Sequence, residues 1–279
     1  TNGLNRDGAQ TTSEIADLTV KGGIKCNKWP DFPIGVNAAT GGLIENTVMI
    51  CGGRVLGSIS NKCYSLTSHK ATLVTHMSVA RSYTASIVLN DNTLWVTGGY
   101  TDDGYSTALS STEKVTLNGI MPGPDLPMAV RSHAMVAINT TASIVIGGLD
   151  GSYTASASTF YYDHIGGEWI NGPSLIHARS YHAAGIVTDE VTDENYLSVT
   201  GGSNINLNAQ DSTEILLDGK WVPGKICDTN SIKFTNSTKL SDYHRLDSFS
   251  NFRTVAFHTY MGSFNGQIRQ KTSNTWRQL

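Results

Sequence analysis

The residues with the clearest chemical potential in this sequence stand at the start of short apolar segments. An arginine opens three of these segments, and a tyrosine or a histidine follows shortly after it. A guanidinium group carries five hydrogen-bond donors in one plane, which suits backbone carbonyls as well as carboxylates and other anions. Two interpretations are therefore open: bonds to carbonyls of a neighbouring repeat, or a site for an anion or a carbohydrate. The residues of this set are Arg81, Arg131, Arg179, Tyr83, His133, Tyr181 and His182.

A second set of candidate partner-binding residues lies in polar segments that each follow a pair of glycines. They are tyrosine, aspartate and asparagine, which suit hydrogen bonding and aromatic anchoring of a partner. The same residue types are also ordinary turn formers. This set comprises Tyr100, Asp102, Tyr105, Asp150, Tyr153 and Asn204.

A catalytic or metal-binding set is not evident. Glu190, Asp193 and Glu194 form an acidic cluster, which we interpret as a solvated hairpin loop. The cysteines and histidines do not show the paired spacing of a zinc site. We therefore expect no catalytic residues, no metal and no cofactor.

The cysteines indicate one disulfide and leave a second open. Cys51 ends one apolar strand and Cys63 opens the next, so adjacent antiparallel strands would bring the two thiols together. Cys26 and Cys227 are distant in sequence and would form a second pair only if the two ends of the chain meet. Four buried thiols in a cytosolic protein are the alternative interpretation.

Further features bear on the compartment and on the class of partner. Asn139 and Asn236 lie in Asn-x-Ser/Thr sequons and are candidate glycosylation sites. Together with the cysteines, a charged-residue content of 15% and a start without methionine, they favour an extracellular or secreted protein, with a cytoplasmic one as the alternative. The net charge of −3 gives no basic footprint for nucleic acid, and no apolar run is long enough for a membrane-spanning helix.

The elements that position these residues repeat along the chain. Four apolar strands each end in two glycines, and the second glycine falls at 53, 99, 148 and 202, a spacing of about 50 residues. An arginine-opened strand precedes three of the four pairs, and later strands open with Ser-Thr-Glu at 111–113 and 212–214. Four short strands per unit, separated by turns, are what one blade of a β-propeller requires. We expect the glycines to end strands that crowd the propeller axis.

The repeat resembles that of Kelch β-propellers, in which a strand ending in two glycines is followed by a tyrosine and then by a tryptophan. Gly147-Gly148 with Tyr161, Tyr162 and Trp169 fits this pattern best, and the resemblance covers about residues 10–223. It implies an all-β, Kelch-type β-propeller. It also implies a partner surface formed by the loops between the second and third strands of each blade.

We expect a single Kelch domain over residues 1–279, with six four-stranded blades favoured and five as the alternative. The ring would close by pairing of N-terminal and C-terminal strands, which removes open sheet edges. Residues 225–251 show no clear strand pattern. The predicted blades span 36–77, 80–128, 130–177, 179–223 and 224–279, and strands within 1–33 complete the closing blade.

The resemblance leaves three functions to weigh. The favoured one is a non-catalytic extracellular binding or structural module that presents loops to a protein or glycan partner, without nucleic acid or membrane insertion, and that can assemble into a larger complex. The alternative is an intracellular Kelch adaptor for protein–protein interaction. The third is a propeller enzyme similar to the copper radical oxidases. Its histidine ligands would come from His133, His182, His244 and His258, but the sequence shows no matched tyrosine–cysteine set.

Overall fold

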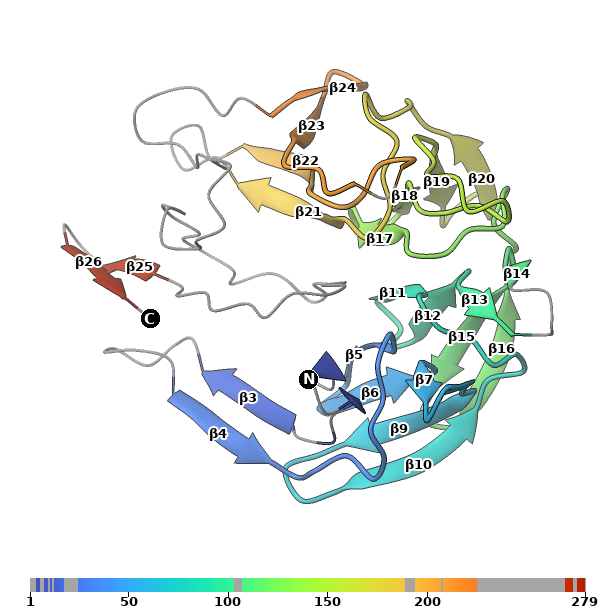
Figure 1. The fold of residues 1–279 in the computed structure, drawn as a ribbon, viewed down its shortest axis with the longest axis vertical. Helices are drawn as coiled ribbons and strands as arrows, with labels where there is room; N and C mark the ends of the chain where they lie inside the picture. The colour runs from blue at the N-terminus through green and yellow to red at the C-terminus, as the bar shows by residue number, and fades with distance from the viewer. Residues whose placement is uncertain are drawn as a thin grey trace.

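The computed structural model describes residues 4–5, 8–9, 11, 13–17, 25–102, 107–188, 194–206, 208–224, 269–272 and 275–278. Within these ranges all regular structure is β-strand. Four four-stranded antiparallel sheets follow one another around a common centre (Figure 1). The prediction of an all-β propeller is confirmed, and each sheet falls within one of the predicted blades. We number these sheets blades 1 to 4.

The strands of each blade run in chain order from the centre outward. Blade 1 contains β5 (Thr40–Ile44), β6 (Thr47–Cys51), β9 (Lys62–Leu66) and β10 (Ala71–His76). Blade 2 contains β11 (Ala85–Val88), β12 (Leu94–Thr97), β15 (Thr112–Thr116) and β16 (Gly119–Gly123). Blade 3 contains β17 (Ala134–Ala137), β18 (Ala142–Ile146), β19 (Thr159–Asp163) and β20 (Glu168–Asn171). Blade 4 contains β21 (Ala183–Thr188), β22 (Asn195–Thr200), β23 (Thr213–Leu217) and β24 (Lys220–Pro223).

Short two-stranded hairpins extend from the second strands of the first two blades. They are β7 (Arg54–Val55) with β8 (Ser58–Ile59), and β13 (Tyr100–Thr101) with β14 (Thr107–Ala108). A hairpin of the same kind, β1 (Leu4–Asn5) with β2 (Gly8–Ala9), precedes β3 (Ser13–Asp17) and β4 (Lys25–Trp29). This order matches blades 1 and 2, where the short hairpin precedes the third and fourth strands.

The predicted closing blade is described only in part. The β3–β4 hairpin and the hairpin of β25 (Arg269–Thr272) with β26 (Thr275–Gln278) lie on the side of the molecule between blades 4 and 1 (Figure 1). They are separate two-stranded sheets in the described part of the chain. Pairing between the terminal strands and the number of blades therefore stay predictions. Residues 225–251 lie outside the described ranges.

The strand nearest the centre is the first strand of each blade, which in blades 2, 3 and 4 is the arginine-opened strand. β5 contacts β11, β11 contacts β17, and β17 contacts β21. The strands that end in glycine pairs, β6, β12, β18 and β22, are second in each sheet. The expectation that these strands crowd the axis is therefore wrong. These strands are apolar because another strand pairs with each of their edges and neighbouring blades cover the faces of the sheet. In β12, for example, all four residues are buried.

The glycine pairs form joints between blades. At Gly148, φ is +103°, and an added Cβ would lie 2.4 Å from Val130 Cγ2 and 2.7 Å from the Arg131 carbonyl oxygen. A side chain at this point would displace the backbone of the neighbouring strand. The second glycine of the first three pairs also donates its N–H to a carbonyl that precedes the next blade: Gly53 to Arg81 (2.9 Å), Gly99 to Val130 (2.8 Å) and Gly148 to Arg179 (2.8 Å).

A belt of backbone hydrogen bonds links the inner ends of the blades. Tyr83 donates to the carbonyl of Ala38 (3.0 Å), Ser132 to Tyr83 (2.8 Å) and Tyr181 to Ser132 (2.9 Å). All four residues have positive φ, between 53° and 55°. The left-handed conformation is unfavourable for residues with a side chain. The conformation is retained because it directs the N–H groups of Tyr83, Ser132 and Tyr181 toward the preceding blade. We call these four residues the inner belt.

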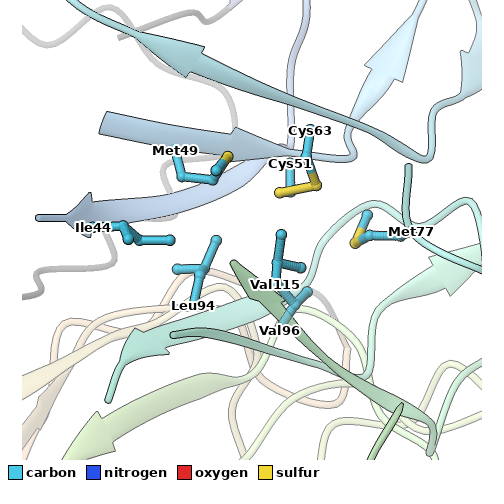
Figure 2. Packing of buried hydrophobic residues seen from close by; sticks show 8 residues of the cluster. All are labelled: Ile44, Met49, Cys51, Cys63, Met77, Leu94, Val96 and Val115. Atoms are coloured by element: carbon cyan, nitrogen blue, oxygen red, sulfur yellow. A yellow bond between two sulfur atoms is a disulfide. The ribbon is translucent and has the colours of Figure 1, made fainter. Parts of the chain in front are cut away.

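The hydrophobic core consists of layers between neighbouring blades. Between blades 2 and 3, the rings of Trp95 and Tyr162 meet edge to face with their centroids 4.8 Å apart. Because each layer has side chains from two blades, no blade buries its apolar surface alone. In the layer shown in Figure 2, Ile44, Met49, Cys51, Cys63 and Met77 of blade 1 and its following linker pack against Leu94, Val96 and Val115 of blade 2.

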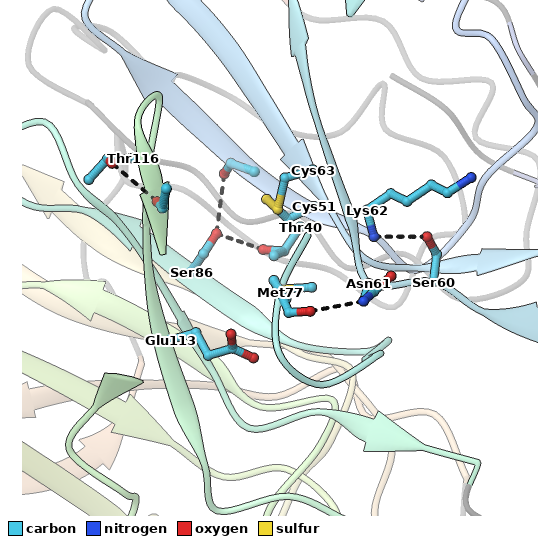
Figure 3. The surroundings of a disulfide bond; sticks show 12 residues. Thr40, Cys51, Ser60, Asn61, Lys62, Cys63, Met77, Ser86, Glu113 and Thr116 are labelled. Atoms are coloured by element: carbon cyan, nitrogen blue, oxygen red, sulfur yellow. Dashed lines mark hydrogen bonds between the residues drawn. A yellow bond between two sulfur atoms is a disulfide. The ribbon is translucent and has the colours of Figure 1, made fainter. Parts of the chain in front are cut away.

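The predicted disulfide between Cys51 and Cys63 is confirmed. The two residues are direct partners on β6 and β9, with Cα atoms 4.1 Å apart and both side chains fully buried (Figure 3). The equivalent pair in blade 4 is Thr200 and Thr213, whose hydroxyl oxygens lie 2.8 Å apart in a hydrogen bond. The disulfide thus takes the place of an ordinary cross-strand contact. Cys227 lies outside the described residues, so a bond to Cys26 stays a prediction.

The joint geometry predicts which glycines tolerate a side chain. Gly148→Ala should lower the free energy of unfolding by about 2–4 kcal/mol, because the Cβ meets backbone in a left-handed conformation. Gly151→Ala is the matched control, since Gly151 is exposed and has open space where its Cβ would lie. Urea and thermal unfolding of the two variants measure the difference. Equal stability of both would contradict the role given to the joint.

Candidate partner-binding site

The three recurrent arginines do not occupy equivalent positions. Arg131 forms a backbone bridge that Asn37, Ser82 and Ser180 form in the other blades. Arg81 and Arg179 stand one residue earlier, where blade 3 has Val130. The three arginines therefore do not form one set of equivalent side chains. The bridges that align the repeats join Asn37 to Arg54, Ser82 to Tyr100, Arg131 to Leu149 and Ser180 to Ser203.

Arg179 is fully buried and forms an ion pair with Glu214 at 2.6 Å. Its Nη1 donates to the carbonyls of Gly201 (2.8 Å) and Ser212 (3.0 Å), and its Nη2 also donates to the Ser212 hydroxyl (3.0 Å). These carbonyls belong to the arginine's own blade, whereas the sequence interpretation placed them in the neighbouring one. The guanidinium group thus ties the start of blade 4 to its second and third strands.

Arg81 repeats this arrangement in blade 2, with Glu113 at 2.8 Å. Burial lowers the pKa of Arg81 below its ordinary value, and the Glu113 carboxylate opposes that shift. The carboxylate also accepts the N–H groups of Ser78 (2.7 Å) and Val79 (3.2 Å) in the linker from blade 1. Each arginine–glutamate pair therefore fixes both a blade and the chain that enters it. Being fully buried, Arg81 and Arg179 are not exposed to a partner.

Blades 1 and 3 replace this ion pair by two apolar residues. Val130 stands at the arginine position of blade 3, and Phe160 stands at the glutamate position of β19. In blade 1 the corresponding residues are Val36 and Tyr64. The equivalence follows from the joints, because Gly52 and Gly147 donate to the residues that directly precede Cys63 and Thr159. Arginine and glutamate thus occur together or are both absent, which identifies their pairing as a structural unit.

Arg131 has a different environment. Its side chain is only 7% exposed, and its Cζ lies 4.8 Å from the Tyr100 ring centroid and 4.1 Å from the Tyr153 ring centroid. Arg54 Cζ lies 6.0 Å from the same Tyr100 centroid, and its Nη2 donates to the Gly57 carbonyl at 3.2 Å. We call Arg54, Tyr100, Arg131 and Tyr153 the arginine–tyrosine row. It crosses blades 1, 2 and 3 at the end that carries the loops after the glycine pairs.

Two of the predicted loop residues shape their own loops. Asp150 Oδ1 accepts the N–H groups of Ser152 (2.8 Å) and Thr154 (2.9 Å), which fixes the turn that carries Tyr153 at a φ of +61°. In blade 4, the Asn204 side-chain oxygen accepts two backbone N–H groups in the same way (2.9 and 3.0 Å). Asp150 and Asn204 are therefore positioning residues. Each holds a loop in one conformation.

The remaining predicted loop residues divide between a described and an undescribed part. Asp102 is exposed directly after β13. Tyr105 lies outside the described residues.

Asn139 is exposed in the turn between β17 and β18, and its side-chain oxygen accepts the Thr141 N–H (2.8 Å) and hydroxyl (2.9 Å). Asn236 lies outside the described residues.

The aromatic and histidine residues next to the arginines lie in two places. The rings of Tyr83 and Tyr181 meet edge to face with their centroids 6.0 Å apart, so side chains of blades 2 and 4 meet near the centre. His133 and His182 are 2% exposed and lie in the joints. His133 Nε2 forms a hydrogen bond of 2.9 Å with the Thr97 hydroxyl. The histidines therefore pack between blades and do not line a central channel.

The described part of the chain offers no metal centre. No group of three or more His, Cys, Asp or Glu side chains gathers there in a way that could hold an ion. His244 and His258 lie outside that part. The same residues contain no helix that is long and apolar enough to cross a membrane.

Three exposed loop residues stand out in the structure, and two of them, Leu56 and Ile205, are not indicated by the sequence patterns. Leu56, Tyr153 and Ile205 are 92%, 51% and 58% exposed, and each lies at the tip of a loop that follows a glycine pair. Tyr153 was expected from its residue type, whereas Leu56, Ile205 and the neighbouring Arg54 were not. Their common signal is position, since each falls shortly after a glycine pair, as Tyr100 does. We call these three residues the apolar tips.

Comparisons with known proteins agree with the fold. No protein-family model matches the sequence. The chain is 27% identical to beta-scruin of Limulus polyphemus over 152 residues, which is 50% of this chain and 16% of beta-scruin. The solved structure of YjhT superposes with a TM-score of 0.67 at 14% identity, covering 79% of this chain and 81% of YjhT. With the repeat described above, these similarities support a Kelch-like propeller.

The exchange of ion pair for apolar pair within one molecule predicts a compensating double variant. Arg179→Val alone should destabilise the protein by about 3–5 kcal/mol, because it leaves Glu214 charged and buried. Arg179→Val with Glu214→Phe copies the pair of blade 3 and should recover at least half of that loss. Urea unfolding of both single variants and the double variant gives the coupling. Additive losses would show that the pair is not the structural unit.

Proposed function

We propose that this Kelch-like β-propeller is a non-catalytic binding module that acts outside the cell and recognises a protein partner with its loop-bearing end. The observation that carries the proposal is the set of apolar tips: three blades each expose a large apolar side chain, Leu56, Tyr153 or Ile205, from loops at the same end. Exposed apolar groups cost free energy in water unless a partner covers them.

The construction of these loops supports recognition. They project from second strands that are buried in the rigid part of the ring, and Asp150 and Asn204 fix two of them by side-chain bonds to the backbone. Ordered loops lose little conformational entropy when a partner binds. A rigid scaffold that presents ordered loops is a common way to build a binding surface. The arrangement therefore suits recognition of a protein surface.

The extracellular part of the proposal rests on one feature of blade 1 and one of blade 3. The disulfide between Cys51 and Cys63 is of a kind that persists in oxidising compartments. Asn139 is exposed in a tight turn, where a glycan would meet no obstacle from its own sheet. An intracellular adaptor, the alternative, would keep the loop-bearing end but not the disulfide or the glycan.

The partner-binding role predicts a sharp difference between two pairs of exposed apolar residues. With the full chain as bait, Leu56→Ser with Ile205→Ser should reduce recovery of a partner from native material at least about tenfold. Met121→Ser with Ile165→Ser is the matched control, because these residues are 54% and 81% exposed and lie away from the apolar tips. Quantitative mass spectrometry measures the recovery. A partner retained by the first variant and lost by the control would refute the assignment of this face.

The compartment can be read from the covalent state of the native protein. We expect intact-mass and peptide analysis without reductant to find Cys51 and Cys63 resistant to alkylation and Asn139 carrying a glycan. Asn139→Gln, expressed through the secretory route, should lose one glycan mass and remain folded, because the side chain is exposed. Free thiols at both cysteines together with an unmodified Asn139 would favour the intracellular adaptor.

A further inference from the structure

Arg131 lies at the loop-bearing end, and the contacts of the fold do not explain why a positive charge is buried there. Arg81 and Arg179 each have a glutamate partner and bonds to carbonyls. Across the described ranges, no carboxylate lies within ion-pair distance of Arg131. Its Nε is enclosed without a hydrogen bond, as are the Nε atoms of Arg81 and Arg179, so the missing carboxylate is what sets Arg131 apart. A buried guanidinium group is costly unless its donors are used. The position does not require arginine, because the other blades have Asn37, Ser82 and Ser180 there.

The two tyrosine rings leave the donors of Arg131 available. Tyr100 and Tyr153 contact the guanidinium group at 4.8 and 4.1 Å from its Cζ, which is stacking range for a cation and a ring. Hydrogen bonds of a guanidinium group lie in its plane, where stacked rings do not compete for them. The rings therefore fix the orientation of the group, while its donors remain for another acceptor.

The surroundings make the site cationic with an apolar rim. Arg54 lies on the same Tyr100 ring and, within the described residues, also has no carboxylate partner. The nearby Asp150 uses its Oδ1 to hold the loop of Tyr153. Tyr153 is half-exposed at the edge of the site, and it is one of the apolar tips. Positive charge at the centre and apolar groups around it favour an acid carried between apolar residues.

We propose that the arginine–tyrosine row is a carboxylate-binding site, which accepts a glutamate or aspartate side chain of the protein partner through the in-plane donors of Arg131. The proposal rests on the proposed function and adds the chemistry of the contact. A planar carboxylate matches a guanidinium group with two parallel hydrogen bonds. Tyr153 is held over Arg131 in advance by Asp150, so the site needs little ordering when the acid enters.

The most direct test uses a short blocked peptide of alternating glutamate and leucine as the probe. In NMR spectra of the full chain, the Nε–Hε signal of Arg131 is identified by its loss in Arg131→Lys. Addition of the peptide should shift this signal, whereas the same peptide with glutamine in place of glutamate should not. Arg131→Lys should weaken peptide binding at least about tenfold, because lysine lacks the planar pair of donors. An Arg131 signal unmoved by saturating glutamate peptide overturns the proposal.

Two further measurements keep the outcome clear. Arg54→Gln changes a less buried residue and should weaken the peptide about threefold without loss of thermal stability, which guards against misfolding of the Arg131 variant. Free glucuronate distinguishes a sugar acid from a peptide. If glucuronate shifts the Arg131 signal and the peptide does not, the assignment to a protein side chain is overturned.

Failure of this proposal and failure of the proposed function are separable. A native partner that is lost by Leu56→Ser with Ile205→Ser but retained by Arg131→Lys would leave the partner-binding face in place and overturn the carboxylate site. Loss of the partner in both variants supports the carboxylate site. Retention of the partner by both variants overturns the two proposals together, since neither the tips nor the row would then contribute to recognition.

Discussion

The structure depends on one hydrogen bond that recurs between blades. The N–H of the second glycine in the first three pairs reaches a carbonyl just before the next blade, at Arg81, Val130 and Arg179. Backbone carbonyls and neighbouring side chains fill the space at each of these glycines, so a side chain on the glycine has no room. The requirement for a glycine pair at each joint explains why the pair repeats more faithfully than any other feature. It also fixes the angle at which one blade follows another.

The same joint decides what each arginine does. A residue at the carbonyl position, such as Arg179, points into its own blade and is buried with a glutamate. The residue after it forms the bridge to the end of the second strand, which places Arg131 beside Tyr100 and Tyr153 at the loop-bearing end. A shift of one residue along the chain thus separates a structural cation from one that faces the candidate site. In β structure, neighbouring residues point to opposite faces, so such a shift changes the environment completely.

The sequence predicts the architecture well because its signals are local. The glycine pairs, the alternation of strands and turns, and the Cys51–Cys63 pair each depend on residues close together in the chain. The role of the arginines depends on distant residues: Arg81 and Arg179 meet glutamates 32 and 35 residues away. Spacing alone also predicted that Arg131 is equivalent to Arg81 and Arg179. The linkers between blades differ in length, so the spacing does not reveal that Arg131 stands one residue later in its repeat. The apolar tips carry no motif, and their exposure follows from the orientation of whole blades.

The account is tested most directly by native-state hydrogen exchange, followed residue by residue with NMR. The amide N–H groups of the joints and of the inner belt donate the hydrogen bonds that make the blades one cooperative unit. Examples are those of Gly99, Gly148, Ser132 and Tyr181. We expect them to exchange only through global unfolding, with protection that falls with denaturant as the global stability does. Exchange of these amides as fast as that of the exposed Gly151, while the strands of each blade stay protected, would show that the blades are independent and would contradict the account.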